Sequence, residues 1–154
     1  MIKIYKNTSL EKIEKIDSIE KNCWIDLVSP TIEEIDLVVE KTNIDKNLIL
    51  KLLDEEEIPR VEFEGNSTLI VVDCPYIEGK NNRYSTLPMG IIISSDNYFL
   101  TISSKKQEVL KVIRSNKVKN VQISMKSRLL IQILYQNAKL YLKYLKMINN
   151  NIDK

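Results

Sequence analysis

The side chains best suited to chemistry are four consecutive carboxylates, Asp54-Glu55-Glu56-Glu57. Carboxylate oxygens suit hard divalent cations, and Mg²⁺ keeps several of its waters, so one or two surface carboxylates suffice for a weak site. The run therefore predicts weak metal binding at Asp54, Glu55, Glu56 and Glu57. A solvated helix end remains the alternative interpretation, because runs of like charge usually lie on the wet surface.

Several other chemistries are excluded by composition. The 154 residues include no histidine, which removes His-based catalysis and His-ligated zinc. The three glycines, Gly65, Gly79 and Gly90, form neither a phosphate loop nor a dinucleotide fingerprint. Cys23 and Cys74 lack CxxC spacing and lie in apolar runs, so we expect buried, reduced thiols. A net charge of +2, from 23 basic and 21 acidic residues, does not favour nucleic-acid binding.

The remaining ionisable candidates occupy isolated positions. Asp26 and Asp73 are each flanked by apolar strand-like residues, which favours structural hydrogen-bond acceptors over metal ligands. Arg60 is expected to pair with Glu62, Glu64 or the acidic run, and phosphate binding is its alternative role. A pocket in which Asp26, Asp73 and Arg60 converge would instead indicate a ligand-binding domain.

These residues surround a predicted β-hairpin. Pro59 cannot continue the helix that is expected to end in the acidic run, because it has no N–H. Val61 and Phe63 then alternate with polar residues, which predicts a half-buried strand. A turn follows at Gly65-Asn66, and the continuously apolar residues 69–72 indicate a strand covered on both faces. We expect this hairpin at the centre of an α/β sheet.

The elements before the hairpin are predicted from periodicity and helix caps. Thr31 with Glu34 forms a capping-box pattern, and Asp45 is placed to cap a second short helix. Apolar residues recur every third position from Leu10 to Ile19, which suits a helix. We expect strands at residues 2–4 and 23–28 and helices at residues 8–22, 31–41 and 46–53.

The elements after the hairpin end in a long helix. Residues 78–84 are polar and predict an exposed loop, followed by strands 87–94 and 98–102 around a turn at 95–97. Ser103 or Ser104 is expected to cap a helix whose solvent-exposed face carries Lys105, Lys106, Lys111 and Arg114. From about Ser124, apolar residues spaced by three and four predict one continuous helix whose apolar surface calls for a helical partner.

Four short motifs in register carry a resemblance. They are Trp24-Ile25-Asp26-Leu27, Pro30-Thr31-x-Glu33-Glu34-Ile35, Pro59-Arg60-Val61-Glu62 and Leu69-Ile70-Val71-Val72. In order and spacing they resemble the cytoplasmic N-terminal domain of the CorA family of divalent-cation channels. The resemblance implies an α/β fold, with a mixed β-sheet layered by helices. It also implies that residues 8–22 form a strand and loop rather than a helix.

The resemblance further implies how the chain is organised. Residues 1–154 would be a single cytoplasmic regulatory domain, with an α/β core over 1–120 and a long helix over 121–154. That helix would be the first arm of a helical hairpin, cut before the stalk and membrane helices of the family. The family's partners are identical subunits, arranged as a homopentamer, and its transported cations are Mg²⁺ and Co²⁺.

The resemblance also implies a mechanism, in which a weakly bound regulatory Mg²⁺ neutralises carboxylates of adjacent subunits and holds a closed assembly. One departure bears on it: Leu50-Lys51 stands where many members carry an acidic pair, so Asp54 or Glu55 would have to substitute. We expect no enzyme. The alternative function is a stand-alone α/β domain that binds proteins through the exposed face of residues 124–152, or binds a ligand, without catalysis.

Overall fold

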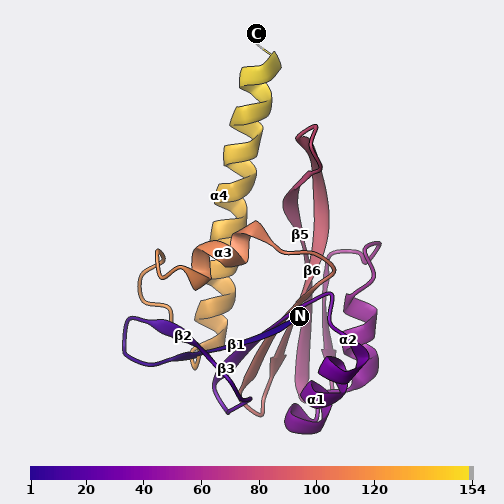
Figure 1. The fold of residues 1–154 in the computed structure, drawn as a ribbon, viewed down its shortest axis with the longest axis vertical. Coiled ribbons are helices and arrows are strands. Elements are labelled where there is room, and N and C mark those ends of the chain that lie inside the picture. The colour runs from indigo at the N-terminus through magenta and orange to yellow at the C-terminus, as the bar shows by residue number, and fades with distance from the viewer. Residues whose placement is uncertain (153–154) are drawn as a thin grey trace.

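The computed structural model describes residues 1–152 as one mixed β-sheet with two helices on each face (Figure 1). The strands are β1 (Ile2–Asn7), β2 (Ile13–Ile16), β3 (Cys23–Val28), β4 (Arg60–Glu64), β5 (Ser67–Glu78), β6 (Arg83–Ser94) and β7 (Tyr98–Ser103). The helices are α1 (Ile32–Thr42), α2 (Lys46–Leu52), α3 (Glu108–Arg114) and α4 (Lys126–Ile152). The predicted fold class, an α/β mixed sheet layered by helices, is confirmed.

The strand order is β2-β1-β3-β7-β6-β5-β4. β3 and β7 are parallel, and the other neighbouring strands are antiparallel. The turn at Gly65 joins β4 to β5 as predicted, with a φ of +58° that glycine adopts at little cost. The expectation that this hairpin is central is wrong: β4 is an edge strand and β7 is the middle strand. A continuously apolar strand indicates that both faces of the sheet are covered at that strand. A strand next to the edge strand, such as β5, meets this condition as well as a central strand does.

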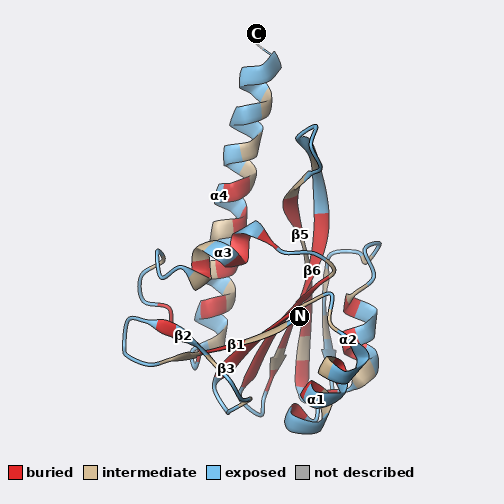
Figure 2. Ribbon diagram, in the orientation of Figure 1, coloured by how far each residue is buried: buried red, intermediate tan, exposed pale blue. Residues whose placement is uncertain are grey.

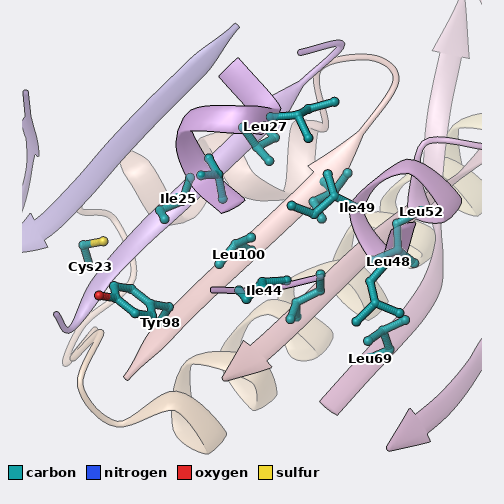
Figure 3. Close-up of a cluster of buried hydrophobic side chains, with 14 of the residues drawn as sticks. Cys23, Ile25, Leu27, Ile44, Leu48, Ile49, Leu52, Leu69, Tyr98 and Leu100 are labelled. Carbon is teal, nitrogen blue, oxygen red and sulfur yellow. The ribbon is translucent and has the colours of Figure 1, made fainter. Parts of the chain in front are cut away.

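Two apolar layers hold the helices to the sheet. On one face, α1 contributes Ile35 and Val38, and α2 contributes Ile49 and Leu52, to a core with β3, β5 and β7. Figure 3 shows the α2 residues Ile49 and Leu52 near Leu69 and Leu100 of the sheet. On the other face, α3 and α4 pack on Trp24, Phe99 and neighbouring side chains. Figure 2 shows that the buried positions concentrate where helices and sheet meet, while most of the far end of α4 is exposed.

Local signals place the first two helices. Thr31 caps α1, its hydroxyl accepts from the Glu34 N–H at 3.1 Å, and Glu34 accepts from the Thr31 N–H at 2.9 Å. This is the predicted capping box. Asp45 caps α2 by accepting from the Asn47 N–H at 2.9 Å, also as predicted.

Three boundaries differ from those predicted. Residues 8–22 contain strand β2 and loops instead of a helix, because Ile13 packs into the core while β1 pairs with β2. The expected loop at 78–84 is shorter, since β5 and β6 pair over twelve residues each, as far as Glu78 and Arg83. The N-cap of α3 is Gln107 instead of a serine, and the Ser103 hydroxyl instead donates to the Lys105 carbonyl at 2.8 Å.

Helix α4 begins at Lys126, slightly later than predicted, and continues to Ile152. Asp153 and Lys154, the end of the helix predicted at 121–154, lie outside the described residues. Figure 1 shows α4 running past the body of the sheet alongside the long β5–β6 hairpin. Within residues 1–152, no helix combines the length and the apolar character required to span a bilayer.

Candidate functional site

The acidic run lies in a turn between α2 and β4, not at the end of a helix. Helix α2 ends at Leu52 with Leu53 as its C-cap, and edge strand β4 begins at Arg60, so residues 54–57 belong to the connection. The carboxylate of Asp54 accepts from the Glu56 N–H at 2.9 Å, and the Glu57 N–H donates to the Asp54 carbonyl at 3.3 Å. These bonds form a compact acidic turn, which we define as residues 54–57.

The four carboxylates of the acidic turn have different surroundings. Glu55 accepts a hydrogen bond from the Ser104 hydroxyl at 2.7 Å, and Glu57 forms an ion pair with Arg60. Glu56 is exposed and forms no ion pair within residues 1–152. The described residues contain no cluster of three or more Asp, Glu, Cys or His side chains arranged to hold a metal. The turn therefore offers separate carboxylates and no preformed metal cage.

Positive charge lies beside the turn. Arg60 contacts both Glu57 and Glu62, as predicted, and its hydrogen bond is the main reason that the pKa of Glu62 is lowered. The Lys51 ammonium lies 3.7 Å from Glu62. Leu50 is 40% exposed beside it, so the surface at Leu50 and Lys51 is apolar and cationic. Asp54, Glu55 and Glu56 remain the carboxylates that Arg60 does not neutralise.

Asp26 belongs to a separate, buried network. Trp24 Nε1 donates to Thr101 Oγ1 at 2.8 Å, and Thr101 donates to Asp26 Oδ1 at 2.9 Å. Arg114 from α3 donates to Asp26 Oδ2 at 3.1 Å. Burial raises the pKa of Asp26, while the Thr101 hydrogen bond and the Arg114 charge oppose that shift. Asp26 is thus a structural hydrogen-bond acceptor, as predicted. The prediction that Arg114 lies on the solvent-exposed face of its helix is wrong, because its guanidinium reaches the buried Asp26.

The other candidates do not converge with Asp26. Asp26, Asp73 and Arg60 lie on β3, β5 and β4, and strands β7 and β6 separate Asp26 from the other two. The backbone carbonyl of Asp73 accepts from Asn137 Nδ2 at 3.1 Å and from the Tyr141 hydroxyl at 2.8 Å. These bonds attach α4 to β5, and periodicity alone could not identify them.

The two thiols are buried and free, as predicted. Burial raises the pKa of Cys74 to about 12 and also raises the pKa of Cys23. A thiol with such a pKa is protonated at neutral pH, and the thiolate is the form that attacks electrophiles and binds metals. Neither cysteine is therefore suited to nucleophilic chemistry in the folded chain.

Comparison with known proteins identifies the family. The family model described as CorA-like Mg²⁺ transporter protein matches residues 20–154. The cobalt/magnesium transport protein CorA of Methanocaldococcus jannaschii is 30% identical over 135 residues, which cover 85% of this chain and 41% of that protein.

Two solved structures from the same organism match nearly the whole chain. The complete CorA magnesium transporter has a TM-score of 0.81 and 26% identity, covering 99% of this chain and 49% of that one. The soluble domain of CorA has a TM-score of 0.80 and 29% identity, covering 97% of this chain and 61% of that one. This chain thus spans about half the length of the relatives that it matches, and it belongs to the CorA-like Mg²⁺ transporter family.

Proposed function

We propose that this chain is the cytoplasmic regulatory and assembly domain of a CorA-like channel for Mg²⁺ or Co²⁺. The observation that carries the proposal is the match, at a TM-score of 0.80, to the soluble domain of a CorA protein over 97% of this chain. In this proposal the domain performs no catalysis, its partners are identical subunits, and the pore belongs to segments outside these 154 residues. The domain lies on the cytoplasmic side of the cell membrane.

The acidic turn is the proposed cation-sensing site. Asp54, Glu55 and Glu56 supply hard oxygen donors, and each retains at least one carboxylate oxygen outside the hydrogen bonds described above. Such a donor set fits a hydrated Mg²⁺ held largely through its own waters, a mode that Mg²⁺ favours because it dehydrates reluctantly. It does not fit a dehydrated ion, because the described residues hold no converging set of three ligands.

The proposed response is electrostatic. Two like charges 4 Å apart repel by about 1 kcal/mol in water and about 4 kcal/mol at an effective dielectric constant of 20. Carboxylates of the acidic turn that approach a neighbouring subunit would repel its carboxylates when no cation is held. A bound Mg²⁺ supplies two positive charges that remove this repulsion. The subunits therefore associate at high cation concentration and separate when it falls.

Lys51 shapes the proposed site. Its ammonium occupies the surface where an acidic pair would otherwise attract a cation, and its nearest carboxylate is Glu62 at 3.7 Å. The like charge of Lys51 weakens cation binding within several ångströms of it. The proposed site is consequently centred on Asp54 to Glu56. Because these carboxylates do not form a complete set of ligands, cation binding is weak and depends on carboxylates of a neighbouring subunit.

Light scattering of the purified chain, first with chelator and then with several millimolar Mg²⁺, tests this function. We expect the mass to rise with Mg²⁺ in the wild type but not in the triple variant Asp54→Asn, Glu55→Gln and Glu56→Gln. The asparagine retains the acceptor oxygen for the Glu56 N–H, so the turn is preserved.

A matched control replaces the exposed carboxylates of another surface, with Glu11→Gln, Glu14→Gln and Asp17→Asn near β2. This control changes the net charge by the same amount and should respond to Mg²⁺ like the wild type. A wild-type mass that Mg²⁺ leaves unchanged would rule out a sensing site within this chain. Equal responses of the two triple variants would place the site elsewhere.

A further inference from the structure

Charge is unevenly distributed along this nearly neutral chain. Residues 105–152 contain eleven basic residues and one acidic residue, Glu108, whereas residues 32–57 contain three basic and nine acidic residues. Helix α4 has five basic side chains and no acidic one, and none of the five forms an ion pair within residues 1–152. Surface helices usually mix both signs, because opposite charges three or four residues apart stabilise each other. The positive charge of α4 is thus not neutralised by the described chain.

Three of these lysines form a cluster on the far half of α4. Lys139, Lys143 and Lys146 are exposed, and their spacings of four and three residues place them on one side of the helix. We call these three residues the lysine cluster. Leu142 and Met147, which are 59% and 39% exposed, line a surface hollow of about 430 Å³ together with the cluster. The cluster therefore adjoins exposed apolar side chains instead of forming a purely charged surface.

Neighbouring elements add little negative charge to the lysine cluster. Lys139 and Lys143 share a second hollow, of about 270 Å³, with Glu108 of α3, but no ion pair joins Glu108 to either lysine in the described structure. The ammonium of Lys139 lies 5.7 Å from the centre of the Tyr135 ring. A cation–π contact attracts the ammonium but supplies no anion, so the positive charge of the cluster persists.

The lysine cluster lies towards a protruding end of the molecule. Figure 1 shows the C-terminal end of α4 and the tip of the β5–β6 hairpin extending in the same direction beyond the sheet. That tip exposes Lys80 and Arg83 beside Glu78, and Figure 2 shows that most of the far end of α4 is exposed. Helices α1 and α2, which belong to the acidic segment 32–57, lie towards the other end (Figure 1). A flat anionic surface that meets the basic end first is therefore repelled least by the acidic segment.

We infer that the lysine cluster binds the anionic headgroups of a phospholipid membrane. The choice of a membrane rests on the proposed function, which places the domain beside one, and on the composition of the cluster. Lysine ammonium groups attract headgroup phosphates, while Leu142 and Met147 enter the boundary between headgroups and acyl chains. Nucleic acid would contact the lysines through its phosphates and leave both apolar side chains without a partner. The contact orients the domain, with the free end of α4 at the membrane and α1 and α2 away from it.

Co-sedimentation of the purified chain with vesicles tests the contact, in chelator and at about 0.1 M salt. We expect binding to vesicles of phosphatidylcholine and phosphatidylglycerol mixed about two to one, and at least about tenfold weaker binding to phosphatidylcholine alone. Each basic residue at an anionic surface strengthens binding about fivefold, so the variant Lys139→Gln, Lys143→Gln and Lys146→Gln should bind about 100-fold more weakly. Binding should also fall at about 1 M salt, because the screening length shrinks from about 10 Å to about 3 Å.

A second variant separates a membrane from a soluble polyanion. Leu142→Asn with Met147→Asn keeps every charge, and it should weaken binding to the anionic vesicles at least about tenfold because it removes apolar area from the interface. Equal binding of this variant and the wild type would indicate attraction of charge alone and overturn the inference. Binding of a short DNA duplex by the wild type, without binding to the anionic vesicles, would assign the cluster to nucleic acid instead.

Controls separate the lysine cluster from net charge and from folding. Lys12→Gln, Lys15→Gln and Lys21→Gln remove the same charge from exposed residues near β2, and this control should bind the anionic vesicles like the wild type. Circular dichroism must show native helix content for every variant compared. The chelator separates this test from that of the sensing site, since loss of the Mg²⁺ response would leave vesicle binding intact, and loss of vesicle binding would leave the Mg²⁺ response intact.

Two further results would overturn the inference. One is a wild-type chain that binds no anionic vesicles at lipid concentrations on the order of 1 mM, where contacts with a Kd in that range become populated. The other is an equal loss of vesicle binding in the β2 control and in the cluster variant, which would show that net charge governs binding and that the position of the lysines on α4 does not.

Discussion

Replacing Arg114 with methionine should destabilise the fold by leaving a buried carboxylate without its cation. Asp26 is 2% exposed, and Arg114 is the ion-pair partner that reaches it from α3. Removing one partner of a fully buried pair costs about 3 to 5 kcal/mol. Because the Arg114 side chain is 19% exposed, we expect the lower end, about 3 kcal/mol at pH 7. For a domain of this size, that loss lowers Tm by about 6 to 12 °C.

The loss should depend on pH in a direction set by Asp26. Burial raises its folded pKa above the ordinary value of 3.8, so the folded state binds more protons than the unfolded state between those two pKa values. Folding stability from this group therefore decreases as pH rises from about 3.8 through the folded pKa. Without Arg114 the folded pKa rises further and this window widens. The difference between variant and wild type should accordingly grow from near pH 4 towards neutrality.

Urea unfolding followed by Trp24 fluorescence measures both effects. Trp24 is the sole tryptophan of the chain, is fully buried and donates its indole N–H to Thr101 within the same network. Arg128→Met is the matched control, since Arg128 is an exposed α4 residue and should change stability by less than about 0.5 kcal/mol. The double variant Asp26→Asn with Arg114→Met should be more stable than Arg114→Met alone, because the amide carries no charge.

Two results would refute the reasoning about Arg114. One is a stability of Arg114→Met within about 0.5 kcal/mol of wild type at pH 7, the size of an ordinary surface effect. The other is a loss that is the same at pH 4 and pH 7, which would indicate lost packing of the arginine stem instead of an unpaired charge. Unequal m-values would indicate a changed unfolded or native state and not a simple change in stability.

Three further changes have defined outcomes. Thiol reagents should leave Cys23 and Cys74 unmodified at pH 7.5 until urea unfolds the chain, since burial raises both pKa values; rapid labelling in buffer would contradict this. Gly90→Ala should cost about 1 to 3 kcal/mol in urea unfolding, because its Cβ would lie 2.7 Å from Leu52 Cβ; a neutral effect would show that α2 shifts freely. Thr31→Ala should cost about 1 kcal/mol by removing the α1 cap, and Thr31→Ser should restore most of it.

Much of the fold could be predicted because its signals are local. The Thr31 and Asp45 caps depend on residues two or three positions away, and both appear as predicted. The turn at Gly65 and the turn ending at Asn97, with a φ of +73°, follow from residues that tolerate positive φ. The wrong helix at residues 8–22 arose because spacing by three also suits a loop whose isoleucines meet the core.

The candidate site was predicted only in its composition. The sequence indicates four adjacent carboxylates, and their role as a cation site remains a prediction. Their different surroundings depend on the tertiary structure. Strand β4 places Arg60 beside Glu57, whose charge it neutralises, and the fold brings the Ser104 hydroxyl to Glu55. The link from Arg114 to Asp26 spans 88 residues, so no local pattern could reveal it.

The sequence by itself determined the caps of the first two helices, the turn at Gly65, most of the strands, the absence of histidine chemistry and the family resemblance. These properties depend on composition or on neighbours within a few residues. Only the tertiary structure decided that β4 lies at the sheet edge, that Arg114 turns inward, and that α1 and α2 cover one face of the sheet while α3 and α4 cover the other. Such outcomes require distant segments to meet, and their energies come from burial and pairing across the sheet, which local propensity does not encode.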